Sequence, residues 1–200
     1  MTTALLDVHR NVQGETRRNG SVIVVVSDTH RSDRPGLKGP LADAISEAAV
    51  VVHAGDFTTE AVHSGFQSVS RRLRAVYGNR DSQELKHRLP AARTIEFAGV
   101  RIALTHTQAG GELGLRYFGE ERDADLVICG HTHRPSVTAA DGITLLNPGS
   151  HTSPRGSDAT YSILSPTEEG LSGAIRTVDG RTDREFVVEG RSRGGRDVPG

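Results

Sequence analysis

Five short apolar segments of this sequence each end in side chains that can bind a metal ion. The endings are Ser27-Asp28-Thr29-His30, His53-Ala54-Gly55-Asp56, Gly78-Asn79-Arg80-Asp81, Thr105-His106 and Gly130-His131-Thr132-His133. Together they offer carboxylate, amide and imidazole groups. Mixed ligands of this kind suit Mn, Fe, Ni, Co or Zn, whereas Ca prefers a cage made only of oxygen atoms.

The spacing within these endings favours convergence on one site. Asp28 and His30 are two residues apart, as are His131 and His133, so in extended chain each pair projects to one side. A glycine before Asp56 lets the backbone turn sharply beside a ligand. Any one ending is also typical of an ordinary turn or helix cap. Turn chemistry does not explain five such endings in 200 residues.

The elements that must position these residues alternate between strands and helices in the first half of the chain. Periodicity predicts strands at Val22–Val26, Val50–Val52 and Leu73–Tyr77, and helices at Leu41–Ala49, from Thr58 or Thr59 to Ser70, and at Ser82–Leu89. The strands are uninterrupted β-branched runs, as expected where both faces of a sheet are buried. Open α/β sheets bind ligands at the C-terminal ends of their strands, where these endings lie.

The second half of the chain is mostly short strands. We predict them at Thr94–Phe97, Val100–Thr105, Leu126–Cys129, Val137–Ala139, Ile143–Leu146, Tyr161–Leu164, Gly173–Val178 and Glu185–Val188, with one helix at Glu112–Glu121. This order predicts an α/β protein with two mixed sheets packed face to face and helices outside. Residues 21–188 would form the domain. Residues 1–20 would be a loose N-terminal extension, and the Gly- and Arg-rich residues 189–200 a disordered tail.

Composition excludes several classes of partner. Lys and Arg number 24 against 25 Asp and Glu, giving a net charge of -1, so no overall field attracts nucleic acid or an anionic membrane. The longest apolar run, Val22–Val26, is far shorter than the roughly 20 residues of a membrane span. The single cysteine, Cys129, fits a reducing compartment. We expect a cytoplasmic protein without a membrane or nucleic-acid partner, and leave homo-oligomer formation open.

The ordered set of endings resembles the calcineurin-like metallophosphoesterase superfamily. The residues that carry the resemblance are Asp28-x-His30, Gly55-Asp56, Gly78-Asn79-x-Asp81, His106 and Gly130-His131-x-His133. Asn147-Pro148-Gly149-Ser150, followed by Pro154-Arg155, resembles its small single-domain phosphodiesterases. The match spans about Val22 to Ser165. It implies a four-layer α/β/β/α sandwich with a dinuclear site at the sheet edges.

The resemblance also implies a role for each candidate ligand. Asp28, His30, Asp56 and His133 would hold one ion, Asp56 would bridge, and Asn79, His106 and His131 would hold the other. A metal-bridging hydroxide would then be the nucleophile. Two divalent ions, two aspartates and one hydroxide leave a charge of about +1, which complements a phosphodiester monoanion. We therefore predict a phosphodiesterase of small substrates, with manganese as the expected ion and Ni, Fe, Co or Zn as alternatives.

Two positions depart from the family pattern. Arg80 stands where many members have a histidine, and Gln108 where a second histidine often follows His106. Because arginine is a poor proton donor, no residue is assigned to protonate the leaving group. We interpret Arg80, Gln108 and His151 as substrate contacts; for Arg80 a solvated surface position is the alternative.

Asn79 and Asp81 are the residues that we assign to catalysis. Asp81 would be an orienting carboxylate, or else the cap of the helix that starts at Ser82. One branch of the superfamily is a coat scaffold subunit with an impaired site. A metal-binding or metal-free interaction module on the same fold is therefore the alternative function. The ligand set, His30 included, is complete here and favours the enzyme.

Overall fold

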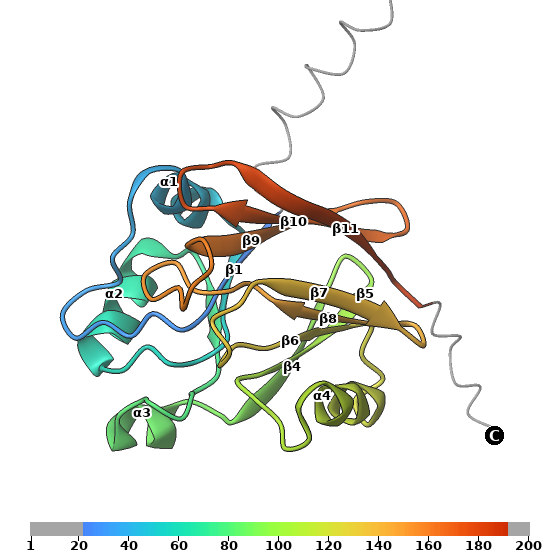
Figure 1. The fold of residues 1–200 in the computed structure, drawn as a ribbon, viewed down its shortest axis with the longest axis horizontal. Coiled ribbons are helices and arrows are strands. Elements are labelled where there is room, and N and C mark those ends of the chain that lie inside the picture. Colours follow the sequence, from blue (N-terminus) through green and yellow to red (C-terminus); the bar gives the residue numbers. More distant parts are fainter. Residues whose placement is uncertain (1–21, 192–200) are drawn as a thin grey trace, which may run out of the picture.

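The computed structural model describes residues 22–191. Its elements follow the order β1 (Ile23–Val26), α1 (Gly39–Glu47), β2 (Val50–His53), α2 (Glu60–Val69), β3 (Leu73–Ala75), α3 (Gln83–Arg88), β4 (Ala92–Phe97), β5 (Val100–Thr105), α4 (Gly111–Glu120), β6 (Leu126–Ile128), β7 (Ser136–Ala140), β8 (Ile143–Asn147), β9 (Thr160–Pro166), β10 (Gly170–Thr177) and β11 (Thr182–Glu189) (Figure 1). Every predicted helix and strand is present, with ends that differ by a few residues.

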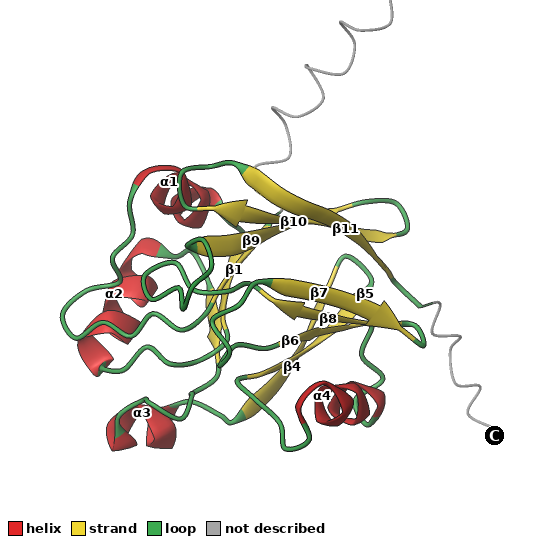
Figure 2. Cartoon of the chain, in the orientation of Figure 1, coloured by secondary structure: helices red, strands yellow, loops and turns green. Residues whose placement is uncertain are grey.

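The strands form two mixed sheets that face each other (Figure 2). One sheet has the order β11-β10-β9-β1-β2-β3 and the other β4-β5-β6-β8-β7. In the first sheet β1 pairs with β2 in parallel and with β9 in antiparallel orientation. In the second, β6 pairs in parallel with both β5 and β8. The predicted α/β class with two mixed sheets is confirmed.

Three apolar clusters hold the four layers together. Ile23 and Val25 of β1 pack with residues of both sheets, so they lie in the core between the sheets. Val24 and Val26 point the other way and pack with residues of α1 and α2. A third cluster joins Phe118 of α4 to the outer face of the second sheet. Because a helix layer covers each outer face, β1 is apolar at every position rather than at alternate ones.

The parallel pairings bring the C-terminal ends of several strands to one edge. β1, β2 and β3 run in parallel in one sheet, and β5, β6 and β8 in the other. The five polar endings follow β1, β2, β3, β5 and β6. This arrangement is the one that places a ligand site outside the ends of parallel strands.

The C-terminal boundary of the domain lies later than predicted. We expected the tail to begin at residue 189, but β11 runs through Glu189, and the amide of Gly190 donates to the carbonyl of Glu169. The predicted extension at residues 1–20 and the rest of the tail, from residue 192, lie outside the described residues. None of the helices in residues 22–191 is long and apolar enough to cross a membrane.

Candidate metal centre

Most of the candidate ligands sit on backbone in the left-handed region. The φ angles are 53° at Asp28, 44° at His30, 60° at Asp56, 74° at His131 and 62° at His133. Residues with a Cβ rarely adopt this region. Such strain costs on the order of 1–3 kcal/mol per residue and gathers at functional sites, where the surrounding structure holds it in place. Here it accompanies the sharp turns by which the chain leaves the strands.

The first group of ligand atoms comes from Asp28, His30 and His133. Asp28 Oδ1 lies 3.6 Å from His30 Nε2 and 3.4 Å from His133 Nε2. The two Nε2 atoms are 3.1 Å apart, and the rings stack with centroids separated by 4.8 Å. Asp28 Oδ1 is buried and accepts no hydrogen bond from the described part of the chain. A buried carboxylate oxygen without a donor is costly unless a cation is its partner.

The second group is centred on Asp56, His106 and Asn79. Asp56 Oδ2 lies 3.4 Å from His106 Nε2 and also 3.3 Å from His30 Nε2 of the first group. Asn79 Oδ1 lies 3.1 Å from His106 Nε2 and 3.0 Å from His131 Nδ1. Candidate ligand atoms of Asp28, Asp56 and His106 all lie within 4.8 Å of one another. The Asp56 carboxylate thus stands between the two groups.

Backbone carbonyls orient two of the imidazoles. His106 Nδ1 donates to Ala54 O at 2.7 Å, and His133 Nδ1 donates to Ser153 O at 2.6 Å. A carbonyl can only accept, so the proton of a neutral ring is on Nδ1 in both residues. Each Nε2 then offers a lone pair to the cluster, as metal-binding histidines do when their other nitrogen is held by hydrogen bonding. The donor set therefore fits divalent ions of the borderline class.

Asp56 and His106 also shift each other's pKa. Burial alone would raise the pKa of Asp56, but the contacts with His106, the Arg80 amide and His30 together outweigh it and the net shift is downward. Burial alone would lower the pKa of His106, but the Asp56 carboxylate, with Asp28 and the Ala54 carbonyl, outweighs this effect and leaves the pKa raised. Without a bound ion, both shifts favour the charged forms of the two groups where they meet, and a metal ion would take the place of the proton on His106 Nε2.

Serine residues that the sequence did not single out hold Asp28 in place. Ser27 Oγ donates to Asp28 Oδ2 at 2.6 Å, and the backbone amide of His131 donates to the same oxygen at 2.9 Å. Ser150 Oγ donates to the Asp28 carbonyl at 2.7 Å and accepts from the Ser153 amide at 2.8 Å. The sequence drew attention to Ser150 only as the last residue of the Asn-Pro-Gly-Ser motif, and it predicted no role for the side chain.

Two glycines leave room for the carboxylates. A Cβ at Gly78 would lie 2.1 Å from Asp56 Oδ1, and one at Gly130 would lie 1.9 Å from Ser27 Oγ and 2.7 Å from Asp28 Oδ2. These separations are far below any van der Waals contact. Glycine at these two positions thus allows close packing against the candidate ligands.

Asp81 supports the loop that carries Asp56. It is buried, and its carboxylate accepts backbone N–H groups from Thr58 at 2.6 Å, Gly78 at 2.8 Å and Asp56 at 3.2 Å. Burial raises its pKa against the effect of these hydrogen bonds. The cap of α3 is Ser82, whose side chain accepts from the Leu85 amide. These contacts fit the orienting alternative, in which Asp81 holds the backbone of the loop that carries Asp56.

The three predicted substrate contacts lie in different environments. Arg80 is exposed, with its backbone amide 2.7 Å from Asp56 Oδ1. Gln108 donates to Thr105 Oγ1 at 3.0 Å and lines a hollow next to His106. His151 is buried; its Nε2 donates to Pro35 O at 3.0 Å. Burial lowers the pKa of His151 to about 4. These contacts favour a structural role for His151 over the predicted substrate contact.

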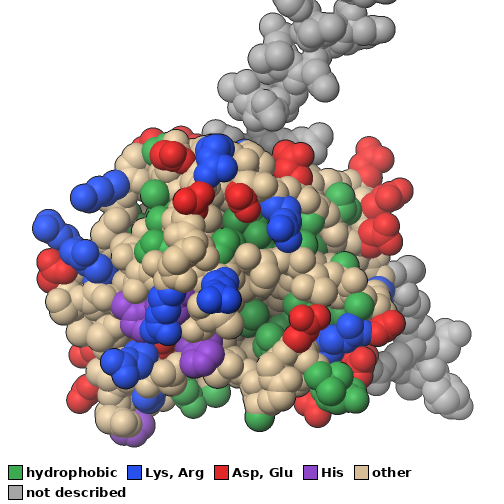
Figure 3. All heavy atoms as spheres, viewed as in Figure 1, with side chains coloured by type: hydrophobic (Ala, Val, Ile, Leu, Met, Phe, Trp, Pro, Cys, Tyr) green, Lys and Arg blue, Asp and Glu red, His purple; other side chains and the backbone are tan. Residues whose placement is uncertain are grey.

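The ligand cluster reaches the surface on the side of His131, Asn79 and His30. His131 is exposed and His30 is partly so. Figure 3 shows histidine side chains grouped on the surface, with Lys and Arg side chains around them. A small anionic substrate could therefore approach the cluster, and cationic side chains would favour that approach.

Comparison with known proteins identifies relatives. Residues 22–169 match the calcineurin-like phosphoesterase superfamily domain. A protein named probable metallophosphoesterase, from Methanothermobacter thermautotrophicus, is 34% identical over 158 residues, which cover 77% of this chain and 91% of the relative. A phosphodiesterase of Methanocaldococcus jannaschii is 25% identical over 139 residues, covering 64% and 82%. The solved Vps29 of Chaetomium thermophilum has a TM-score of 0.74 at 17% identity, covering 86% and 100%, and shows the same fold.

Proposed function

This chain belongs to the calcineurin-like phosphoesterase superfamily, and on that premise we propose that it is a phosphodiesterase that works with two divalent metal ions. One observation carries the proposal. Asp56 Oδ2 lies 3.3 Å from His30 Nε2 and 3.4 Å from His106 Nε2, the position that a carboxylate shared between two ions requires. Asp28 Oδ1 also supports the proposal, because this buried oxygen accepts no hydrogen bond in the described structure and a cation would be a suitable partner for it.

The ligands divide into two sets in this proposal. Asp28, His30, Asp56 and His133 would hold one ion, and Asp56, Asn79, His106 and His131 would hold the other, with Mn as the expected metal. When bound, such a pair of ions supplies an activated water as the hydroxide nucleophile and offsets charge on the phosphate. Asp56 contributes to both sets, so it has the largest effect on the spacing between them.

The charge of the chain's own ligands supports a diester substrate. Asp28 and Asp56 are the two carboxylates of the cluster, and with two ions and one hydroxide they leave a charge of about +1. That value complements a phosphodiester monoanion better than a monoester dianion. The phosphodiesterase among the relatives supports the same class.

Arg80 is the side chain that we assign to the phosphate oxygens. Its backbone amide is tied to Asp56 Oδ1 at 2.7 Å and its side chain is exposed, so the guanidinium can reach outward over the cluster. A guanidinium binds phosphate oxygens but does not release a proton near neutral pH. The leaving oxygen therefore gains no proton from Arg80, and rates should fall as the leaving group becomes more basic.

The test compares bis(p-nitrophenyl) phosphate with p-nitrophenyl phosphate after reconstitution with Mn. We expect a higher kcat/KM for the diester, and loss of activity by at least about 1000-fold, with loss of bound metal, in Asp56→Asn. Asp158→Asn is the matched control, because Asp158 is an exposed carboxylate paired with Arg181. Preference for the monoester would overturn the substrate class. Normal turnover of Asp56→Asn with full metal content would overturn the site.

An interaction module on the same fold is the second candidate. The likeness to Vps29 extends over nearly the whole domain, but at this identity it shows the fold alone. Metal analysis separates the two functions: a purified chain that takes up no divalent ion and hydrolyses neither ester would favour the module.

A further inference from the structure

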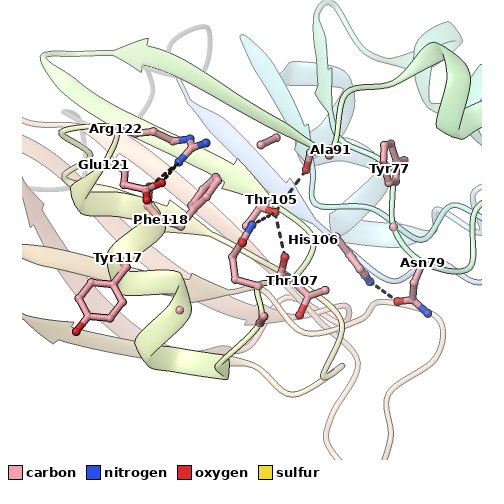
Figure 4. Close-up of a pocket in the computed structure, with 15 residues that line it drawn as sticks. Tyr77, Asn79, Ala91, Thr105, His106, Thr107, Tyr117, Phe118, Glu121 and Arg122 are labelled. Atoms are coloured by element: carbon pink, nitrogen blue, oxygen red, sulfur yellow. Dashed lines mark hydrogen bonds and ion pairs between the residues drawn. The ribbon is translucent and has the colours of Figure 1, made fainter.

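A hollow of about 570 Å³ adjoins the second group of candidate ligands. Asn79 and His106 form part of its wall, so the hollow is continuous with the ligand cluster (Figure 4). Its other walls come from the segment after β3, from the start of β4, from the loop after β5 and from α4. A volume of this size is within the range of ordinary small-molecule sites.

Aromatic rings stand on opposite sides of this hollow. Tyr117 and Phe118 come from α4, and Tyr77 comes from the segment that leads to Asn79 (Figure 4). The guanidinium of Arg122 lies over the Phe118 ring, 3.9 Å from its centroid, and donates to the Phe118 carbonyl at 3.1 Å. Tyr117 is 56% exposed although it is a large ring. Flat aromatic groups pack well against walls of this kind.

The hollow carries almost no net charge. Glu121 and Arg122 line it and form an ion pair of 3.2 Å with each other. The Thr105 hydroxyl oxygen accepts a hydrogen bond from Gln108 Nε2 at 3.0 Å. An anionic group would gain little from these walls, because the one cation among the lining residues already has a carboxylate partner. An uncharged ring would gain from apolar burial.

We propose that this hollow binds one ester substituent of the substrate, and that the substituent is an uncharged aromatic group, either an aryl ring or a nucleobase. The inference rests on the proposed function, since it needs a phosphate bound at the adjacent cluster. The ester substituent is the part of the substrate that the metal centre does not contact. Tyr77 and Tyr117 are its specificity-determining residues, whereas Phe118 is buried beneath the Arg122 guanidinium and supports the wall.

The experiment measures binding of phosphate monoesters to the Mn-reconstituted protein by calorimetry. Methyl phosphate, phenyl phosphate and thymidine 5′-phosphate each carry a single substituent, so either orientation at the cluster leaves that group free to enter the hollow. We expect phenyl phosphate to bind about tenfold tighter than methyl phosphate, which corresponds to about 1.4 kcal/mol. Tighter binding of the thymidine ester than of the phenyl ester would assign the hollow to a nucleobase, and the reverse order to a simple aryl ring.

Two variants change the hollow without touching the candidate ligands. Ala91 is exposed, directly precedes β4 and lines the hollow, so Ala91→Phe should fill it. Tyr117→Ala removes one wall. Leu113→Ala is the matched control, because Leu113 is 57% exposed on the same helix as Tyr117 but does not line the hollow. We expect the phenyl preference to fall to about twofold or less in both variants and to persist in the control.

The outcomes separate this inference from the proposed function. Equal affinities for methyl and phenyl phosphate in the unmodified protein, or a preference that survives both variants, would overturn the aromatic subsite. Because binding is measured without turnover, a protein that hydrolyses no ester but keeps the phenyl preference would contradict the proposed function and support the subsite.

Discussion

Asp28→Asn should have opposite effects on stability with and without metal. The Asp28 side chain is fully buried, its Oδ2 accepts from Ser27 Oγ and from the His131 amide, and its Oδ1 has no hydrogen-bond donor in the described structure. Without metal, an amide in its place removes a buried charge that is only half satisfied. At about pH 8 we expect the metal-free variant to be as stable as the unmodified protein or more stable, by on the order of 1 kcal/mol.

With metal the order should reverse. An ion that binds only the folded state adds about 2.7 kcal/mol of stability at a free concentration of 100 times its Kd. For a domain of this size that increment raises Tm by about 5–10 °C. Asp28 is a ligand of the first group, and its carboxylate also lies within 4.8 Å of candidate ligand atoms of Asp56 and His106, so Asp28→Asn should remove most of the increment.

Asp81→Asn is the matched control, because Asp81 is also a buried carboxylate. Its oxygens accept three backbone N–H groups, from Thr58, Gly78 and Asp56. An amide would turn an NH₂ group toward one of these donors, at a cost of about 1–3 kcal/mol. We expect a lower Tm under both conditions, with the increment from metal retained.

Thermal melts of the unmodified protein, Asp28→Asn and Asp81→Asn, in EDTA and in excess Mn, test whether Asp28 is a metal ligand. The expected result is a metal increment in the unmodified protein and in Asp81→Asn, and little or none in Asp28→Asn. A full increment in Asp28→Asn would refute the assignment of Asp28 as a ligand. Loss of the increment in Asp81→Asn alone would move the ligand role to Asp81.

Three further predictions concern the surroundings of the site. Gly130→Ala would place a Cβ 1.9 Å from Ser27 Oγ and should abolish metal uptake in calorimetry, while Gly99→Ala, where a Cβ meets nothing within 4 Å, should not. Burial lowers the pKa of His151 to about 4, so the folded state binds fewer protons than the unfolded state at mildly acidic pH. Stability should be full above about pH 6.5 and fall by up to about 3 kcal/mol toward pH 4; urea melts of His151→Gln should show a smaller fall, and an equal fall would contradict the assignment. Burial raises the pKa of Cys129 to about 12, so a thiol reagent at about pH 8 should label the native protein at least about 100-fold more slowly than the denatured one, and comparable rates would show that Cys129 is accessible.

Local signals were sufficient to predict the individual elements. Thr59 caps the helix that the sequence placed after it, and Ser82, predicted as the first residue of the next helix, is that helix's N-cap. Ala98 and Gly99 both have positive φ and join β4 to β5 as the predicted hairpin. Such features depend on neighbours in the chain, which is why they can be recognised without the fold.

The contacts that complete the fold and the site are long-range or involve the backbone. β1 pairs with β9, with Ile23 opposite Leu164, and no local pattern specifies that partner. The carbonyls of Ala54 and Ser153, which orient His106 and His133, leave no mark in the sequence because every residue has a carbonyl. The choice between the two roles of Asp81 likewise depended on the position of the Thr58 amide.

Titration of the metal-stripped protein with Mn, while the hydrolysis of bis(p-nitrophenyl) phosphate is followed, tests the dinuclear phosphodiesterase most directly. Bound metal is counted in the same samples. We predict no hydrolysis without metal and a rate that rises until about two equivalents are bound, because Asp56 would join both sets of ligands. Full hydrolysis by protein without metal, or no hydrolysis with two ions bound, would contradict it.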